Sequence, residues 1–402
     1  MDTIVLKEDI SPASAIIRSG GLVAVPTETV YGLAGNGLDA DAVSAIYEVK
    51  GRPAVKPLSL MVPDAAAMER YGVDVPEQAK RLAERFWPGP LTIVVKAQAD
   101  IPAIVLAGGS TVGLRCPDHP LTLALLRECG LPLAAPSANP SGEESPKDAA
   151  QVLNYFDGKI DCVIDGGPCG LGQESTILDM SAAPYRILRQ GALPAEEIAQ
   201  ALADDMRVIG VTGGSGAGKT TCLLALEELG ALVIDCDEVY HGLLKSSAPM
   251  LDELEHAFPA AFTDGALDRR ALGRIVFSDP EALLRLNAVT HRYVREAVEE
   301  LLREGAMRGY TLAAVDAAEL IAGGLGERCT ATVAVVADEE RRIERITARD
   351  GISRDAAEKR IRAQKPDSYY RTNCDYTLEN NADQACFLED CRRLMKEILH
   401  HG

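Results

Sequence analysis

The chain has 402 residues, of which 47% are hydrophobic and 25% charged, as in folded proteins of ordinary composition. Residues 1–200 carry 25 acidic and 16 basic side chains, net −9, and the remaining residues carry 35 acidic and 25 basic ones, net −10. Neither part has the basic excess that nucleic-acid binding requires. We therefore expect small anionic substrates in local cationic pockets and no stable complex with nucleic acid.

Three further features bound the class of protein. No apolar run approaches the length of about 18 residues that a membrane span needs, so we expect no membrane association. The opening MDTIVLKEDI lacks a basic segment followed by an apolar one, so we expect no signal peptide. Ten cysteines occur without a CxxC pair, which is typical of reduced thiols in a cytoplasmic protein.

Alternating strand-like and helix-like segments predict an α/β fold for both halves of the chain. In the first half, a helix is expected over 11–20 with Ser11 as its N-cap and Pro12 at its first position. Another is expected over 39–50, capped by Asp39. Buried strands are predicted at 20–25, 58–62, 91–95 and 162–165.

Lys50, Arg52 and Lys56 crowd into seven residues of the segment VKGRPAVKPLSLMV, beside a predicted strand. The glycine and proline of this segment indicate that the preceding helix ends at 51–53, which places the three cations in a loop. Like charges this close repel one another. Either exposure to solvent or a bound polyphosphate would relieve the repulsion, and the residues alone leave both interpretations open.

Polar side chains follow or flank several other predicted strands. They are Thr27, Thr29 and Tyr31 in PTETVYGLAG, Arg115 in VGLRCPDHP, Ser137 and Asn139 in PSAN, Ser175 and Thr176 in ESTILD, and Arg189 in ILRQGAL. Each segment alone would be an ordinary turn. Together, strand ends that present donors and few acids indicate one anion-binding crevice.

These segments, together with FWPGPLT, resemble the YrdC-like family of L-threonylcarbamoyladenylate synthases over roughly residues 10–192. The family signature Lys-x-Arg with Ser-x-Asn is matched by Lys50, Arg52, Ser137 and Asn139. The resemblance implies a twisted mixed sheet with helices. It also implies one reaction, in which bicarbonate carboxylates L-threonine and the carbamate then attacks the α-phosphate of ATP, releasing pyrophosphate, with Mg²⁺ accompanying the triphosphate.

The same resemblance implies roles for individual residues. Lys50 and Arg52 would be the catalytic cations, because charge develops on the phosphates and no covalent nucleophile is needed. The nucleotide would be bound by Lys50, Arg52, Lys56, Ser137, Asn139 and Arg189. Threonine would be bound by Thr27, Tyr31, Arg115 and Ser175.

A domain boundary is expected in the segment RQGALPAEEIAQALADDMR, where a polar, alanine-rich stretch precedes a new buried strand. We expect a first domain at 1–200, a linker at 201–206 and a second domain at 207–402. Strands of the second domain are predicted at 207–211, 231–235, 311–316 and 331–336, and a closing helix at 383–400.

The segment VIGVTGGSGAGKTTC places the pattern GxxxxGK[ST] between a predicted strand and a predicted helix, the context in which this pattern is specific. Glycines let backbone N–H groups face a phosphate, and the helix N-terminus adds its positive dipole end. Lys219 would reach the β- and γ-phosphates of ATP and act in catalysis, and Thr220 would coordinate Mg²⁺. The loop residues are Gly213, Gly214, Ser215, Gly216, Ala217, Gly218, Lys219, Thr220 and Thr221.

Asp235 and Asp237 follow a predicted strand in VIDCDEVYH, at the edge of the sheet where ligands of α/β folds bind. One carboxylate can accept the proton of an attacking hydroxyl, and one can cap the next helix. Further on, ITARDGISRDAAEKRIRAQKPD predicts a basic helical hairpin with Arg345 and Arg349 on one face. Such a hairpin is either a lid over transferring phosphates or a solvated helix face.

The second half resembles dephospho-CoA kinases over about 207–400, through GVTGGSGAGKTT, VIDCDEVYH, LDRRALGRIVFSDPEALLRLNAVTH, RITARDGIS and CDYTLENNAD. The resemblance implies a P-loop kinase with a parallel sheet and a helical lid. It makes Asp237 the base for the ribose 3′-hydroxyl of dephospho-CoA and Arg349 the catalytic lid arginine. It places Asn380 near adenine, and Asp235, Arg269 and His291 on the acceptor side.

Two positions depart from the pattern of these kinases. Ser215 stands where an aliphatic residue is common. The segment VDAAELIAGGLGE keeps the aspartate of the family pattern Asp-x-Pro-Leu-Leu-Phe-Glu, as Asp316, but loses the proline and the phenylalanine. We therefore do not carry the family's acceptor contacts over to this segment, whereas the phosphate chemistry is unaffected.

The sequence thus predicts a bifunctional cytoplasmic enzyme that uses ATP in both domains. The other substrates would be L-threonine, bicarbonate and dephospho-CoA, and a downstream tRNA-modifying transferase would be a partner. The alternative is a non-catalytic RNA-binding module fused to a P-loop kinase for another acceptor. The net charge of −9 on residues 1–200 argues against that module.

Overall fold

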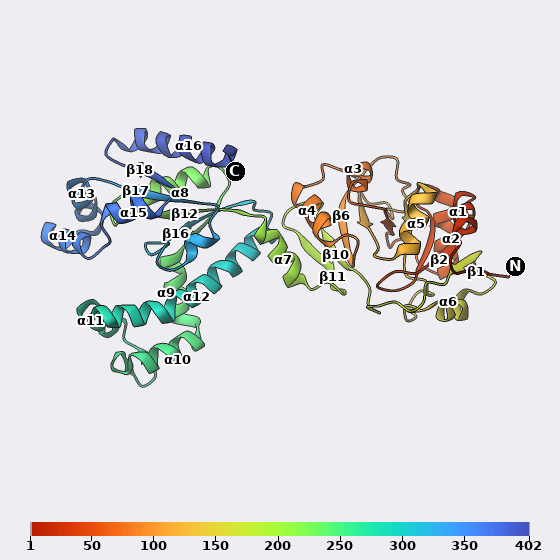
Figure 1. Cartoon of the computed structure of the whole chain (residues 1–402), viewed down its shortest axis with the longest axis horizontal. Helices are drawn as coiled ribbons and strands as arrows, with labels where there is room; N and C mark the ends of the chain where they lie inside the picture. The colour runs from red at the N-terminus through yellow and green to blue at the C-terminus, as the bar shows by residue number, and fades with distance from the viewer. Residues whose placement is uncertain (1, 402) are drawn as a thin grey trace. The chain divides into compact units, whose positions relative to one another are not determined.

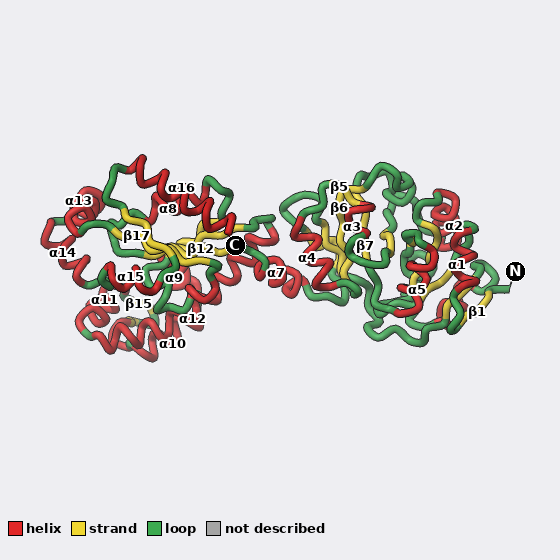
Figure 2. The backbone as a smooth tube through the Cα atoms, turned by 45° about the horizontal axis from the view of Figure 1, so that its top comes forward, coloured by secondary structure: helices red, strands yellow, loops and turns green. Residues whose placement is uncertain are grey.

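The structure is a computed structural model that describes residues 2–401. The chain divides into two compact units, one of residues 1–202 with 307–309 and the other of residues 203–306 with 310–402 (Figures 1 and 2). Helix α7 (Ala195–Asp204) includes residues 201–204 of the segment that the sequence suggests as a linker.

Among the described residues, the first unit contains one sheet of eleven strands, in the order β1-β9-β2-β3-β8-β4-β7-β6-β10-β11, with β5 paired to β6. The strands are β1 Ile4–Leu6, β2 Val23–Val25, β3 Gly32–Asn36, β4 Ser59–Met61, β5 Gly72–Val73, β6 Leu91–Ala97, β7 Thr111–Arg115, β8 Leu133–Ala134, β9 Cys162–Ile164, β10 Thr176–Asp179 and β11 Arg186–Arg189. The helices are α1 Ser11–Arg18, α2 Ala40–Lys50, α3 Ala67–Tyr71, α4 Glu77–Phe86, α5 Pro120–Cys129 and α6 Ala149–Phe156. Parallel pairs such as β6–β10 and antiparallel pairs such as β6–β7 occur together, so the mixed sheet is confirmed.

Helices α1 and α5 build an aliphatic core over the part of the sheet that holds β2 and β9. Ile10 at the N-cap of α1 and Ala13 and Ile17 on the helix recur at helical spacing and are buried there, together with Leu125 of α5 and Val23 of β2. Small and branched side chains fill this core, as the scarcity of aromatic residues in the sequence implies.

The predicted N-cap of α1 is wrong, whereas that of α2 is confirmed. Ile10 occupies the N-cap position of α1 without a side-chain cap, and Ser11 is already helical. The amide of Ser11 donates to Oδ1 of Asp9 at 3.0 Å, so an acid two residues earlier takes the place of the serine. Asp39 caps α2 by accepting from the amide of Asp41 at 2.9 Å.

The second unit, within residues 2–401, contains a five-stranded parallel sheet in the order β13-β16-β12-β17-β18 and a separate hairpin of β14 and β15. The strands are β12 Arg207–Thr212, β13 Leu232–Asp235, β14 Phe262–Thr263, β15 Ala266–Leu267, β16 Leu312–Asp316, β17 Ala331–Val336 and β18 Tyr376–Glu379. The helices are α8 Lys219–Glu227, α9 Cys236–Ser246, α10 Ala248–Ala257, α11 Arg269–Ser278, α12 Pro280–Met307, α13 Glu339–Asp350, α14 Arg354–Arg362, α15 Asp367–Asn373 and α16 Gln384–His401. The predicted parallel sheet is confirmed.

Helices α8 and α16 lie side by side over one face of this sheet (Figure 1). Cys222 and Leu226 of α8 and Phe387 and Met395 of α16 are buried in one core cluster with the sheet. All six residues of β17 are buried, as expected for a central parallel strand covered on both faces. No helix within residues 2–401 combines the length and the apolar character that crossing a membrane requires.

The register of the parallel sheet aligns the ends of three neighbouring strands. Val211 of β12 and Asp235 of β13 both lie opposite Asp316 of β16. Because the strands are parallel, their carboxyl ends meet at one edge, and the glycine-rich loop leaves β12 there. The fold thus places the loop beside the acidic residues that follow the two neighbouring strands.

Replacing Asp39 with Ala should destabilise the first unit by about 1 kcal/mol, because α2 loses the oxygen that accepts from its first turn. Asp39→Asn keeps an acceptor and should retain most of this stability. Trp87 is the only tryptophan of the sequence and is buried in the first unit, so its fluorescence during urea unfolding follows that unit. Equal unfolding midpoints for the wild type and Asp39→Ala would contradict the assigned cap.

Candidate functional sites

Strand ends of both directions meet at one edge of the first-unit sheet. β7 ends at Arg115, beside the start of the antiparallel strand β6. β10 runs parallel to β6, so Ser175, the residue before β10, lies at the same edge. β11 returns along β10 and ends there at Arg189, and a bridge between Gly32 and Ser137 adds the loop after β8. The side chains that the sequence marks as strand-end donors therefore come together.

A cavity of about 720 Å³ opens at this edge of the sheet. The predicted site residues that line it are Arg52, Arg115, Ser137, Ser175 and Arg189. Thr92 and Glu174, which the sequence did not single out, also line it, and Glu174 is the only acid among the described lining residues. Three guanidinium groups and one carboxylate make this cavity suited to an anion.

Two of these arginines have backbone oxygens as hydrogen-bond partners. Arg189 donates from Nε and Nη2 to the carbonyl oxygen of Ser175, at 3.1 and 2.8 Å. Arg52 donates from Nη2 to the carbonyl oxygen of Pro57 at 3.2 Å, while its Nε is buried without a hydrogen-bond partner among the described residues. Burial lowers the pKa of both guanidinium groups. A bound anion would satisfy the buried donor of Arg52 and compensate its charge.

Lys50, a predicted phosphate ligand, does not line the cavity. Its side chain is buried at 3% exposure, and its Nζ donates to the carbonyl oxygens of Ser137 and Asn139. Burial, with a smaller contribution from the charge of Arg52, lowers the pKa of Lys50 to about 7. The lysine thus ties the end of α2 to the loop that carries Ser137. Lys56 is exposed outside the lining, and Asn139 is buried beside the cavity, with its Oδ1 lacking a partner within residues 2–401.

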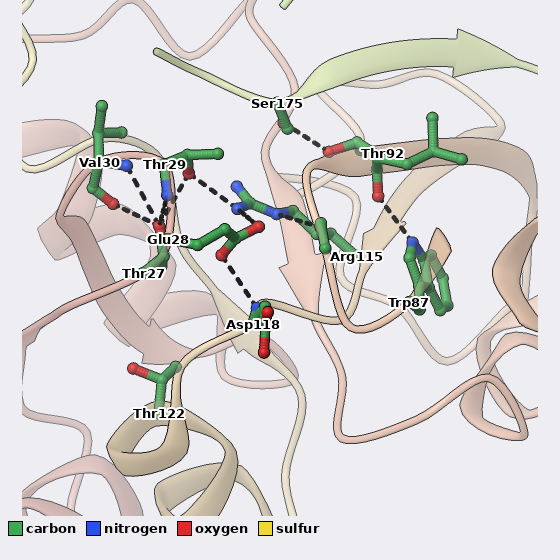
Figure 3. Close-up of polar contacts among 12 residues, drawn as sticks. Thr27, Glu28, Thr29, Val30, Trp87, Thr92, Arg115, Asp118, Thr122 and Ser175 are labelled. Carbon is green, nitrogen blue, oxygen red and sulfur yellow. Dashed lines mark hydrogen bonds and ion pairs between the residues drawn. The ribbon is translucent and has the colours of Figure 1, made fainter. Parts of the chain in front are cut away.

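Arg115 is held by residues whose roles the sequence did not predict (Figure 3). Its Nη2 donates to Oε1 of Glu28 at 2.7 Å and to Oγ1 of Thr29 at 2.8 Å, and its Nε donates to the carbonyl oxygen of Gly89 at 3.3 Å. The side chains of Arg115 and Glu28 are only 9% and 13% exposed. Thr27 lies outside the cavity lining, and its hydroxyl supports this turn by bonding to that of Thr29 at 2.8 Å.

The two remaining predicted threonine ligands differ in position. The Oγ of Ser175 lies in the cavity wall, 2.9 Å from Oγ1 of Thr92. Tyr31 is fully buried outside the lining, where its hydroxyl donates to the carbonyl oxygen of Gly167 at 2.8 Å and accepts from the amide of Gly166 at 3.1 Å. Burial raises the pKa of Tyr31 to about 12. In this structure Tyr31 anchors a loop.

In the second unit, residues 213–218 form the loop between β12 and α8, and Lys219 is the first helical residue. A Cβ at Gly213, where φ is 144°, would lie 2.1 Å from the carbonyl oxygen of Val335. A Cβ at Gly218, where φ is 108°, would lie 2.1 Å from Nδ2 of Asn380. Both positions therefore require glycine. Asn380 donates to the carbonyl oxygen of Ala217 at 2.8 Å, so this residue braces the loop.

Carboxylates gather beside this loop. Nζ of Lys219 lies 3.8 Å from Oδ1 of Asp316, an oxygen that is buried without a hydrogen-bond partner among the described residues. Burial raises the pKa of Asp316 to about 6, opposed by Lys219 and reinforced by Asp235 and Asp237. Asp235 caps α9 by accepting from the amide of Asp237 at 2.8 Å. The carboxylate of Asp237, in the first turn of α9, borders the cavity described below.

The helical hairpin of α13 and α14 touches the tip of the loop through residues that the sequence did not single out. Arg342 of α13 is 4% exposed and donates from Nε to the carbonyl oxygen of Ser215 at 3.0 Å. Gln364, just after α14, accepts from the amide of Ser215 and donates to its Oγ, both at 2.9 Å. Ser215 is thus an anchor between loop and hairpin.

The two arginines predicted on one face of α13 have different partners. Arg345 donates to the carbonyl oxygens of Gly216 at 3.2 Å and Asn380 at 3.0 Å. Arg349, the predicted lid arginine, pairs with Asp350 at 2.7 Å, and 62% of its side chain is exposed. The structure brings Arg345, but not Arg349, to the loop.

A cavity of about 700 Å³ lies on the acceptor side of the loop. Its polar lining includes Asp237, Asn287, Thr290, His291 and Glu319. Ala317, Ala318 and Leu325, from the segment that departs from the kinase pattern, contribute an apolar wall. Arg269 lines an adjoining cavity of about 620 Å³, and Tyr240 lines both cavities. Of the predicted acceptor residues, His291 and Arg269 therefore line two neighbouring cavities. Asp235 lines neither of them and is the N-cap of α9.

Comparison with known proteins gives one family for each unit. A family model of the Sua5, YciO and YrdC proteins, described as telomere recombination, matches residues 15–191, and a model described as dephospho-CoA kinase matches residues 207–385. The chain is 46% identical to a threonylcarbamoyl-AMP synthase of Pyrococcus abyssi over 48% of its own length and 56% of that protein. It is 35% identical to a threonylcarbamoyl-AMP synthase of Halorhodospira halophila, over 43% of the chain and 91% of that protein. It is 36% identical to a dephospho-CoA kinase of Geobacter sulfurreducens, over 48% of the chain and 97% of that protein. The chain thus spans only about half the length of the Pyrococcus abyssi protein.

Replacing Gly213 with Ala should weaken ATP binding in the second unit by at least about tenfold, because the new Cβ meets the carbonyl of Val335 and strains the loop by about 1–3 kcal/mol. Gly242→Ala, in α9, is the matched control, since a Cβ there meets no atom within 4 Å. Calorimetric titration with ATP measures both variants. Unchanged ATP binding in Gly213→Ala would contradict the phosphate-binding role of the loop.

Proposed function

Because the chain belongs to the threonylcarbamoyl-AMP synthase family in its first half and to the dephospho-CoA kinase family in its second, we propose that it is a bifunctional enzyme. The first unit would form L-threonylcarbamoyl-AMP and pyrophosphate from L-threonine, bicarbonate and ATP. The second would phosphorylate the 3′-hydroxyl of dephospho-CoA with ATP. The observation that carries the proposal is that each unit has its own cavity at strand ends with cationic groups beside it.

In the proposed first reaction, the amine of threonine attacks bicarbonate, water leaves, and a carbamate oxygen then attacks the α-phosphate of ATP with pyrophosphate as the leaving group. Arg52 and Arg189 would bind the phosphates and stabilise the charge of the transition state, and Ser137 would bind the nucleotide beside them. The cavity residues Arg115 and Ser175 would hold threonine. Lys50 would position the loop of Ser137 from behind, with its Nζ on two carbonyl oxygens of that loop.

In the proposed second reaction, the carboxylate of Asp237 accepts the proton of the acceptor hydroxyl as that oxygen attacks the γ-phosphate of ATP. Asp237 borders the 700 Å³ cavity, while the carboxylate of Asp235 is occupied as a helix cap. Lys219 and the amides of residues 214–220 would hold the phosphates, and ADP would leave in line as the γ-phosphate passes to the acceptor oxygen. The amphipathic cavity would take the acceptor, with His291 and Asn287 in its wall.

Mg²⁺ would accompany ATP in both units, and the second unit offers suitable oxygen donors. Oδ1 of Asp316 is buried without a hydrogen-bond partner in the described part of the chain, and Thr220 lies in the first turn of α8. A hydroxyl, a carboxylate and substrate phosphates form a donor set that Mg²⁺ prefers. When bound, the ion would neutralise charge on the β- and γ-phosphates.

The proposal extends to the surroundings of the two reactions. Threonylcarbamoyl-AMP is a mixed anhydride, so a tRNA-modifying transferase would consume it downstream. All substrates are small, and the enzyme would act in the cytoplasm. We place the boundary between the two catalytic domains at 201–206.

Two single substitutions should separate the activities. Lys219→Ala should lower dephospho-CoA-dependent ADP formation by about 10²-fold or more, because a phosphate loses its charged donor, and should leave threonine-dependent pyrophosphate release unchanged. Arg52→Ala should do the reverse. Both reactions are assayed on the full chain with the same ATP concentration. Equal loss of both activities in either variant would contradict two independent sites, and absence of either activity in the wild type would remove the corresponding half of the proposal.

Asp237→Asn should lower kinase turnover by about 10²-fold or more with little change in the affinity for ATP, because the amide cannot accept the hydroxyl proton. Steady-state kinetics with dephospho-CoA and calorimetric titration with ATP measure the two effects. Asp252→Asn, which removes a carboxylate on α10, serves as the control and should be active. Weaker ATP binding with unchanged kcat would assign Asp237 to the nucleotide instead.

A further inference from the structure

The arginines that line the cavity of the first unit differ in whether a carboxylate compensates their charge. Arg52 donates hydrogen bonds to Pro57 and Arg189 to Ser175, and no carboxylate within residues 2–401 lies at ion-pair distance from either guanidinium. Arg115 faces the same cavity but is paired with the buried carboxylate of Glu28 at 2.7 Å. Arg52 and Arg189 therefore line the cavity without a carboxylate at ion-pair distance, whereas the part of the lining at Arg115 is charge-compensated.

The pair of Arg115 and Glu28 is fixed on both sides (Figure 3). Glu28 uses Oε1 for Arg115 and Oε2 to accept from the amide of Asp118 at 2.9 Å. Arg115 uses Nη2 for Glu28 and Thr29 and Nε for Gly89. Among the described residues, none accepts a hydrogen bond from Nη1. The guanidinium thus has one orientation and one nitrogen for a ligand.

We propose that Glu28 is a positioning and specificity-determining residue, which fixes Arg115 and cancels its charge so that this part of the cavity accepts the single carboxylate of an amino acid and not a phosphate. The inference rests on the proposed function of the first unit and deepens it. An uncompensated Arg115 would extend the cationic field of Arg52 and Arg189, and a dianionic phosphate would gain more from that field than a monoanionic carboxylate. Discrimination between two anions in one cavity therefore needs a compensating acid in the part that takes the amino acid.

The test uses Glu28→Gln in the full chain. The amide can accept from Arg115 but not also from the amide of Asp118, and it carries no charge. Loss of one charge-assisted hydrogen bond and of the fixed orientation should weaken L-threonine binding about tenfold or more. Asp118→Asn is the matched control, because it removes an exposed carboxylate next to the pair and keeps the backbone amide that Glu28 binds.

Calorimetric titration with L-threonine, with and without inorganic phosphate, gives the binding readout, and threonine-dependent pyrophosphate release gives KM. We expect phosphate to compete with threonine in Glu28→Gln but not in the wild type or in Asp118→Asn, with KM for threonine raised and KM for ATP within about twofold of the wild type. A merely structural loss would lower the active fraction and leave both KM values and the phosphate response unchanged. Wild-type threonine affinity, or the absence of phosphate competition, in Glu28→Gln would overturn the inference.

The outcomes separate this inference from the proposed function. If the wild type binds threonine with a dependence on Glu28 but releases no pyrophosphate, the proposed reaction fails and the role of Glu28 stands. If the wild type releases pyrophosphate and Glu28→Gln behaves as the wild type, the proposed reaction stands and the role of Glu28 fails. Should Glu28→Gln not fold, Thr29→Val keeps the charge pair and removes one of the two anchors of Nη2, together with the bond between the hydroxyls of Thr27 and Thr29. It should weaken threonine binding without phosphate competition, and unchanged affinity in this variant would overturn the positioning role.

Discussion

Burial of positive charge against neutral oxygen atoms is the constraint on which both sites depend. Arg52 and Arg189 in the first unit, and Arg345 in the second, donate to backbone carbonyl oxygens beside the site. Desolvation lowers the pKa of all three guanidinium groups, which shows that their surroundings do not fully compensate the charge. A polyphosphate that enters supplies the missing negative charge. Folding has thus already removed water from the cations, so ligand binding does not have to desolvate them.

The two units prepare for an anion by different means, and their sheets explain the difference. In the second unit, parallel strands end together, so a loop of backbone amides and the N-terminus of α8 point at one place. The mixed sheet of the first unit has no common carboxyl edge, because β6 and β7 run in opposite directions. Guanidinium groups from separate strands and loops take the place of amides there. Under the proposed function, the first site would depend on charge pairing for its specificity, whereas the second would depend on backbone curvature.

The predictions from sequence hold where the determining residues are neighbours in the chain. The loop of the second unit was predicted because Gly213, Gly218 and Lys219 form one local pattern, and Asp39 was predicted because an N-cap is local. The partners of Arg115 and Ser215 were missed because they come from far along the chain, 87 residues away for Glu28 and 149 for Gln364. Lys50 was expected among the phosphates because charge alone does not reveal that a side chain turns inward toward carbonyl oxygens. Ser11 failed as a cap because the helix begins one residue earlier than predicted, so Ile10 takes the N-cap position and the amide of Ser11 itself donates to the carboxylate of Asp9.

Because the chain is acidic, the hydrogen-bond partners of the carboxylates near each site bear on how an anion could bind there. Glu28 is committed to Arg115, Asp235 to the amides of α9, and Glu174 to the hydroxyl of Ser145 at 2.7 Å, a bond that lowers the pKa of Glu174. Each of these acids therefore has a donor of its own, which compensates part of its charge, and of the three only Glu174 lines the cavity of the first unit. Asp237 and Glu319 are different, because within residues 2–401 no hydrogen bond or ion pair engages either carboxylate and both residues line the 700 Å³ cavity. Asp237 lies in the first turn of α9, directly after the strand that ends opposite Asp316, so its position, and not the lack of a partner alone, supports the proposed role as the base.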